Sequence, residues 1–185
     1  MRKVKLQMQV SVDGFVASPN GDLSWAVWNW DDELKQFVGE LTNPVDCILL
    51  GRKLAEGFIP HWTNAANDTN NPEVEAAIKF RDTPKVVFSR TLVDSPWENT
   101  KVSNDIKKEV TQLKNQPGGD IIIYGGASTV AGFIKEGLID ELNLFINPVA
   151  IGKGLSIFNE VEKNLDLKLV ESRQFSCGIV LLRYK

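Results

Sequence analysis

Apolar and polar residues alternate one by one at the start of the chain. From Val4 to Val12 every second residue is apolar, and the residues between them are Lys, Gln or Ser. This period of two predicts a β-strand with one buried face. Later apolar runs are short and almost continuous, which is typical of parallel strands that are covered on both faces. The strands predicted in this way span residues 47–50, 85–88, 121–124 and 142–146.

Between these runs, the spacing of the apolar residues is that of helices. Leu34, Phe37, Val38 and Leu41 fall at i, i+3, i+4 and i+7, on one face of a helix expected over residues 31–42. Further helices are expected over residues 72–80, from the N-cap Asp105 through Leu113, and from the turn 125–128 to Glu136. Residues 63–72 are expected to form a polar loop, and residues 165–175 and 178–184 a β-hairpin.

The order of these elements predicts the fold class. Strands alternate with helices up to residue 147, and the hairpin follows. This order is typical of an α/β fold with a mainly parallel central sheet, helices on both faces and an antiparallel hairpin at one edge. The length of 185 residues suits one domain, which we expect to span residues 1–185.

Composition and charge exclude several classes of protein. The net charge is −3, and no stripe of Lys and Arg alternates with aromatic residues, so no nucleic-acid partner is expected. No apolar stretch is long enough for a signal peptide or a membrane span. Cys47 and Cys177 are 130 positions apart and are expected to be free thiols, which favours a cytoplasmic protein. With a single histidine, His61, no transition-metal site is expected.

Three short turns carry the residues best suited to binding a ligand. Each directly follows a predicted buried strand, and ligands of open α/β sheets bind outside the carboxyl ends of the strands. Glycine lets backbone N–H groups approach a phosphate, and arginine pairs with phosphate oxygens. A dinucleotide with several phosphates would therefore suit these turns, which are residues 51–53 (Gly-Arg-Lys), 89–91 (Ser-Arg-Thr) and 125–128 (Gly-Gly-Ala-Ser).

Each turn has a simpler interpretation when it is taken alone, because glycine after a strand is common in ordinary turns. Neither the G-x-G-x-x-G motif nor the G-x-x-x-x-G-K-[ST] motif occurs. A hydrolase would use His61 as base and Ser89 or Ser128 as nucleophile, but no G-x-S-x-G motif supports it.

Several ordered segments resemble the RibD C-terminal domain family of dihydrofolate-reductase-like reductases, in particular its short members. The resemblance implies a dihydrofolate-reductase-like three-layer sandwich over nearly the whole chain. The matching segments are Ser11–Ala17, Ile48–Arg52, Pro84–Leu92, Asp120–Gly126, Gly137–Leu142 and Asn147–Gly154.

The resemblance implies NADPH as the cofactor. Gly51, Arg52 and Lys53 are expected near the phosphates, and Ser89, Arg90 and Thr91 at the adenosine 2'-phosphate. The pyrophosphate would lie against the turn formed by Gly125, Gly126, Ala127, Ser128 and Thr129, whose Gly125–Gly126 peptide bond is expected to be cis. Val16 and Ala17 would flank the nicotinamide, and the backbone of Gln9 would meet its carboxamide.

The substrate site is expected beside the first helix. Trp25 would cover the substrate, with a core aromatic residue as the alternative, and Phe37 would line the site. Glu33 is the predicted proton donor and shares a helix face with Phe37; Asp31 and Asp32 are its competitors. The alternative is that all three carboxylates are capping and first-turn charges of the helix.

By this resemblance the chain is an NADPH-dependent reductase that transfers hydride to a C=N or C=O of a heterocyclic or ribosylamino substrate. The nearest model is 5-amino-6-(5-phosphoribosylamino)uracil reductase of riboflavin biosynthesis, and a dihydrofolate-type pterin reductase is an alternative. Another is a non-catalytic, dimeric nucleotide-binding scaffold, because Leu54 replaces the threonine that is common in the family. A homodimer is expected, with residues 165–170 and 179–182 as a candidate interface and ordinary core strands as the alternative.

Overall fold

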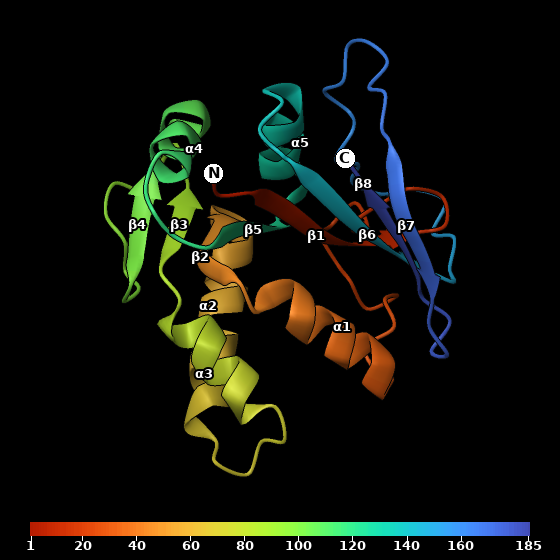
Figure 1. The fold of residues 1–185 in the computed structure, drawn as a ribbon, viewed down its shortest axis with the longest axis horizontal. Coiled ribbons are helices and arrows are strands. Elements are labelled where there is room, and N and C mark those ends of the chain that lie inside the picture. The colour runs from red at the N-terminus through yellow and green to blue at the C-terminus, as the bar shows by residue number, and fades with distance from the viewer.

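One twisted sheet runs through the molecule and separates two layers of helices (Figure 1). The computed structural model describes residues 1–185. The strands are β1 (Val4–Ser11), β2 (Val45–Gly51), β3 (Lys85–Phe88), β4 (Thr100–Ser103), β5 (Asp120–Gly125), β6 (Glu141–Asn147), β7 (Leu169–Gln174) and β8 (Val180–Tyr184). The helices are α1 (Asp32–Thr42), α2 (Arg52–Asn67), α3 (Val74–Asp82), α4 (Ile106–Lys114) and α5 (Ala127–Lys135).

The strand order is β4-β3-β2-β5-β1-β6-β8-β7. Strands β1 to β6 pair in parallel, whereas β8 pairs antiparallel with both β6 and β7. Strand β1 is central, and its register places Lys5 between Ile122 of β5 and Glu141 of β6. The α/β class, the mainly parallel sheet and the antiparallel hairpin at one edge are therefore as the sequence predicts.

Both faces of the sheet are covered by helices. On one face, Leu6 and Met8 of β1 pack in a cluster with Val110 of α4 and Phe133 of α5. On the other face, α1 and α2 cover separate parts of the sheet: Phe37 packs near Phe145, and Ile59 packs near Ile122 in a second cluster. Figure 1 shows α4 and α5 above the sheet and α1, α2 and α3 below it.

Three parts of the chain differ from the expected elements. No helix was expected directly after β2, where α2 begins at Arg52. The polar loop expected at 63–72 is shorter, because α2 continues through Pro60 to Asn67, with Ile59 and Ala66 buried. Tertiary packing thus outweighs the weak helix preference of the asparagines in this segment. Strand β4 was not predicted, because its residues are partly exposed and lack an apolar pattern. It forms because its backbone pairs with β3 along the edge of the sheet.

Smaller differences concern the ends of elements. Strand β1 ends at Ser11, β7 begins at Leu169, and α3 begins at Val74. None of the five helices combines the length and the apolar composition that crossing a membrane requires.

Candidate functional site

The three predicted ligand-binding turns meet at one edge of the sheet. The register pairs Leu50 with Gly125 and Gly51 with Phe88, so the carboxyl ends of β5, β2 and β3 are neighbours. The turns 51–53, 89–91 and 125–129 therefore follow three adjacent strands at the same edge. This is the place where open α/β sheets bind ligands.

The turn after β2 and the turn after β5 are in close contact. A Cβ atom built on Gly51 would lie 3.0 Å from the backbone nitrogen of Gly126 and 3.2 Å from the Cβ of Thr129. Gly125 has a φ of +129°, a conformation that side chains other than glycine rarely adopt. The Gly125–Gly126 peptide bond is cis, as the resemblance implies. These glycines let two stretches of backbone approach more closely than side chains would allow.

Two helices begin at this contact without a side-chain cap. The N-caps of α2 and α5 are Gly51 and Gly126, and no side chain accepts a hydrogen bond from either first turn. By contrast, α1 and α4 begin with the capping carboxylates of Asp31 and Asp105. The free N–H groups and dipoles of α2 and α5 thus converge on one place, which attracts an anion such as a phosphate.

The basic side chains of these turns differ in whether they are free to bind an anionic ligand. Arg52 forms an ion pair with Glu56 one turn further along α2. Lys53 and Arg90 are exposed and form no ion pair within the protein. The Ser89 hydroxyl accepts hydrogen bonds from the backbone of Thr91 (3.2 Å) and Leu92 (2.9 Å), so it shapes the turn that presents Arg90.

Leu54, the departure from the family pattern, lies against the glycine turn. A Cβ atom on Gly125 would be 3.4 Å from Leu54 Cδ2 and 3.5 Å from Met8 Cε. Leu54 therefore packs beneath Gly125 and leaves the first turn of α2 without a side-chain hydroxyl. In that turn the backbone N–H groups, with the side chains of Arg52 and Lys53, are left to bind an anion.

The segment expected to flank the nicotinamide is fixed between two loops. Val16 and Ala17 are buried, and the backbone of both residues is hydrogen-bonded to Leu155. Asp13 holds the same two loops together, because its carboxylate accepts from the Ser11 hydroxyl (2.6 Å) and from the backbone of Gly152 (2.7 Å). These bonds lower the pKa of Asp13, with the Ser11 hydroxyl as the largest cause.

The two residues predicted to contact the substrate lie in different surroundings. Trp25 is half-buried in the loop before α1, and its indole nitrogen donates to the backbone oxygen of Asp22 (3.2 Å). Phe37 is buried edge-to-face against Phe145 and Phe175. It faces the β6–β8 side of the sheet rather than the three turns.

The candidate proton donors also lie away from the turns. Glu33 forms an ion pair with Arg173 of β7 (2.6 Å), and its side chain is 55% exposed. Strand β7 is at the far edge of the sheet, separated from β5 by β1, β6 and β8. Asp32 is exposed and makes no hydrogen bond through its side chain. The structure thus does not bring either carboxylate together with the glycine turns.

Asp31 is the N-cap of α1. Its carboxylate accepts from the backbone of Leu34 (2.7 Å) and Cys177 (2.8 Å) and from the Ser176 hydroxyl (2.8 Å). These donors, with Leu34 first, lower the pKa of Asp31 to about 2. Asp31 is therefore ionised at neutral pH and ties α1 to the β7–β8 hairpin.

His61 and the cysteines lie outside the turns. At 1.5 Å per residue, His61 is about 14 Å along α2 from Arg52, which separates it from Ser89 and Ser128. Its ring contacts Trp62 edge-to-face. Cys47 and Cys177 are both free, and burial raises the pKa of the Cys47 thiol to about 11.

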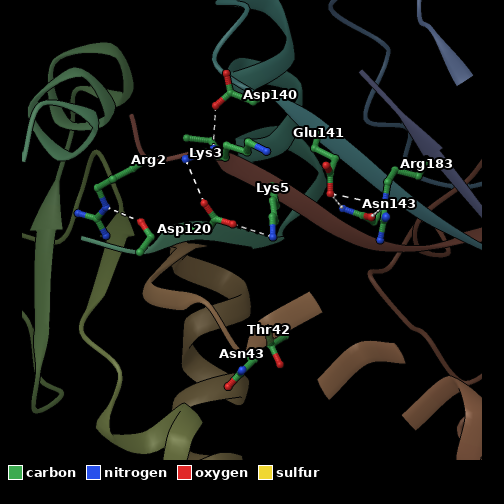
Figure 2. Close-up of polar contacts among 12 residues, drawn as sticks. Arg2, Lys3, Lys5, Thr42, Asn43, Asp120, Asp140, Glu141, Asn143 and Arg183 are labelled. Carbon is green, nitrogen blue, oxygen red and sulfur yellow. Dashed lines mark hydrogen bonds and ion pairs between the residues drawn. The ribbon is translucent and has the colours of Figure 1, made fainter. Parts of the chain in front are cut away.

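A cleft of about 390 Å³ lies at the opposite, amino-terminal edge of the parallel strands. Most of its charged groups form ion pairs, either with one another or with residues just outside the cleft. Figure 2 shows Lys5 beside Asp120 (2.7 Å) and Asn143 between Glu141 and Arg183. The residues lining this cleft are Lys3, Lys5, Phe37, Glu40, Leu41, Glu141, Glu171, Arg173 and Arg183.

One polar network near the site was not predicted from the sequence. Asn147 is fully buried at the end of β6; its Oδ1 accepts from the backbone of Val27 (2.8 Å), and its Nδ2 donates to Gln9 Oε1 (2.8 Å). Asn147 thereby joins the loop before α1 to the end of β1. The Asn147-Pro148 pair only indicated the end of a strand, and nothing in the local sequence points to these distant partners.

Comparison with known proteins gives a consistent family match. The model of the RibD C-terminal domain matches residues 2–181. The uncharacterized protein YyaP of Bacillus subtilis strain 168 is 36% identical over 186 residues, covering 99% of this chain and 94% of its own. The riboflavin biosynthesis protein RibD of Corynebacterium ammoniagenes is 22% identical over 161 residues, covering 83% of this chain but 45% of its own.

Solved structures share the fold. A Shewanella sp. PV-4 protein assigned to riboflavin biosynthesis superposes with a TM-score of 0.72 at 23% identity, covering 100% of this chain and 98% of its own. A deaminase/5-amino-6-(5-phosphoribosylamino)uracil reductase from Thermotoga maritima superposes with a TM-score of 0.69 at 20% identity. The match covers 100% of this chain and 56% of the Thermotoga chain. The chain thus spans about half the length of the RibD proteins that it matches.

Proposed function

Because the chain belongs to the RibD C-terminal domain family, we propose that it is an NADPH-dependent reductase. It transfers hydride to a C=N or C=O bond of a heterocyclic or ribosylamino substrate. The model for this reaction is the 5-amino-6-(5-phosphoribosylamino)uracil reductase activity named for the Thermotoga maritima relative.

The observation that carries this proposal is the convergence of two uncapped helix N-termini at Gly51 and Gly126. The backbone N–H groups of both first turns fit a pyrophosphate, and the close contact of Gly51 with Gly126 and Thr129 holds the two turns together. The residues present thus fit a dinucleotide. When bound, NADPH supplies the hydride, and the protein supplies position and electrostatics.

The preference for NADPH over NADH is assigned to the turn after β3. Arg90 is exposed at the carboxyl edge of the sheet and has no acidic partner, and the Ser89 hydroxyl fixes the backbone beside it. A guanidinium placed there pairs with the two negative charges of a 2'-phosphate. Thr91 adds a hydroxyl to the same turn, and Lys53 adds a second free cation on the neighbouring turn.

The nicotinamide is assigned to the segment Val16–Ala17, where the bonds of Asp13 to Ile151 and Gly152 hold the two loops together. Trp25 covers the substrate from the loop before α1. Glu33 or Asp32 stays the predicted proton donor, and delivery of a proton from Glu33 requires that its ion pair with Arg173 opens.

The alternative function is a non-catalytic, dimeric nucleotide-binding scaffold. The ion pair of Glu33 with Arg173 favours this alternative, since it engages the carboxylate that would donate the proton. Both functions require nucleotide binding, but only the reductase oxidises NADPH.

Quenching of tryptophan fluorescence by NADPH and by NADH tests the proposal. We expect NADPH to bind at least tenfold more tightly than NADH, because only NADPH carries the 2'-phosphate. Binding of neither cofactor would overturn the nucleotide site. Tight NADPH binding without oxidation, across a panel of ribosylaminopyrimidines and pterins, would favour the scaffold.

A further inference from the structure

Strand β7 leaves one edge of the sheet without a partner strand. It is the last strand in the sheet order and pairs with β8 alone, and residues 169–174 take part in no backbone hydrogen bond outside the sheet. Figure 1 shows β7 at the right-hand end of the sheet. The backbone groups on its outer side are therefore free, and such an edge pairs readily with a strand of another chain.

The surface where β7 begins is apolar and exposed. Leu165, Leu169 and Val170 are 46%, 51% and 46% exposed. Leu165 also lines a groove of about 520 Å³ together with Phe158. By contrast, residues 179–182, the other segment expected at a homodimer interface, include two fully buried side chains of the core. The start of β7 is thus the part of the expected interface that is accessible to a partner.

A row of alternating charges crosses the sheet and ends at β7. Lys5 of β1 pairs with Asp120 of β5 (2.7 Å) and is the register neighbour of Glu141 on β6. Arg183 of β8 lies between Glu141 (3.5 Å) and Glu171 of β7 (2.6 Å). Figure 2 shows the part of this row from Asp120 to Arg183. The sign of the charge alternates over five adjacent strands, and the next position in the row lies beyond the edge of the sheet.

Two charged side chains at the end of this row keep a free polar atom. Glu171 accepts from Arg183 through Oε2, and its Oε1 makes no hydrogen bond within the protein. Arg173, on the same face of β7, donates to Glu33 through Nε and Nη2, and its Nη1 makes no hydrogen bond. Both side chains line the cleft at the amino-terminal edge, so the space beside them is open.

We propose that a second copy of this chain pairs antiparallel with β7, with Ser172 on the two-fold axis. In this register Glu171 of each copy lies opposite Arg173 of the other copy, and Val170 lies opposite Gln174. Side chains directly opposite each other have Cβ atoms about 4.5–5.5 Å apart, which allows an ion pair. Pairing centred on Glu171 or on Arg173 would instead place like charges opposite each other, which is unfavourable.

The occupant is a second copy because the charge pattern of β7 is complementary to itself, as a two-fold interface requires. Strand β4, at the other edge of the sheet, carries Lys101 as its one charged residue, so two-fold pairing there gains no ion pair. The β7 pairing also gives Arg173 a second carboxylate besides that of Glu33. No residue of the three turns takes part, so this inference does not depend on the proposed reductase function.

Sedimentation velocity over a range of protein concentrations tests the interface, and we expect the wild type to form a dimer. Ser172→Lys places two lysines opposite each other on the axis, which should raise the dissociation constant of the dimer about fivefold or more. Ser172 is exposed and its side chain makes no hydrogen bond, so the fold of each copy should not change. A monomeric wild type, or a Ser172→Lys dimer as tight as the wild type, would overturn the proposal.

A mixture of two variants tests the register. Ser172→Lys and Ser172→Glu should each weaken the dimer, whereas an equimolar mixture should form a heterodimer at least as tight as the wild-type dimer, because opposite charges then meet on the axis. The control is Gln112→Lys on α4, which adds the same charge at an exposed residue without a side-chain hydrogen bond and should leave the dimer unchanged. If the mixture associates no better than either variant alone, Ser172 is not on the axis.

Discussion

Thr129, in the first turn of α5, packs directly against Gly51 at the end of β2. A Cβ atom on Gly51 would stand 3.2 Å from the Thr129 Cβ, closer still to its hydroxyl, and 3.0 Å from the backbone nitrogen of Gly126. The contact joins two segments that are 75 residues or more apart in the chain, and it places the free N–H groups of two helices side by side.

The variant Gly51→Ala should disturb both stability and cofactor binding. The added methyl group overpacks a backbone contact, which costs about 1–3 kcal/mol in the free energy of unfolding. Because the shift moves the first turn of α5, we expect NADPH binding to weaken by about tenfold or more. Urea unfolding and fluorescence titration measure the two effects.

Gly57→Ala is the matched control on the same helix. A Cβ atom on Gly57 has no heavy atom within 4 Å, and the residue is in the interior of α2. Alanine should therefore raise the free energy of unfolding by about 0.5–1 kcal/mol. Cofactor binding should stay the same, and a loss as large as that of Gly51→Ala would contradict the proposed phosphate contact.

The variant Arg90→Ala tests the 2'-phosphate assignment. Loss of a charge-assisted pair of about 1.5–3 kcal/mol should raise the Kd for NADPH by about 10- to 100-fold. The Kd for NADH should change little, because NADH carries no phosphate there. Arg81→Ala, which removes a half-buried arginine paired with Asp82, serves as the control. Equal losses for the two cofactors would remove Arg90 from this role.

Glu33→Gln and Arg173→Ala together test the proton donor. Both variants break the same ion pair, but only the first removes the carboxylate. If Glu33 is the general acid, Glu33→Gln lowers kcat by about 10²- to 10⁴-fold, and Arg173→Ala leaves most of the activity. Steady-state rates with NADPH distinguish a general acid from a structural ion pair. If both variants lower kcat only slightly and to a similar extent, Glu33 serves only to tie α1 to β7.

Removal of the Asp31 carboxylate should change stability in a pH-dependent way. The pKa of Asp31 is lowered from its ordinary 3.8 to about 2, so its stabilising effect is complete above pH 3.8. The effect is lost as the pH falls through about 2. The difference in Tm between the wild type and Asp31→Ala should thus be largest near pH 6 and shrink toward pH 2. Asp32→Ala, at a neighbouring residue whose side chain makes no hydrogen bond, should show no such trend.

Local sequence patterns were sufficient to predict the central strands and the edge at which the turns meet. Alternation along β1 and the apolar runs of β2, β3 and β5 depend on burial alone, which a short window of sequence reflects. Gly125 is similar, because a φ of +129° requires glycine whatever its neighbours are. The family resemblance added the cis bond and the assignment to NADPH.

Only the tertiary structure decided the features that depend on distant partners. The continuation of α2 past Pro60 follows from packing, and β4 exists because β3 offers a free edge. Glu33 shares a helix face with Phe37, as expected, but its direction was decided by Arg173, 140 residues away. Likewise, Gln7 and Gln9 look alike in the sequence. Only Gln9 accepts a hydrogen bond from a distant side chain, that of Asn147, because hydrogen-bond partners are set by the arrangement of strands in space.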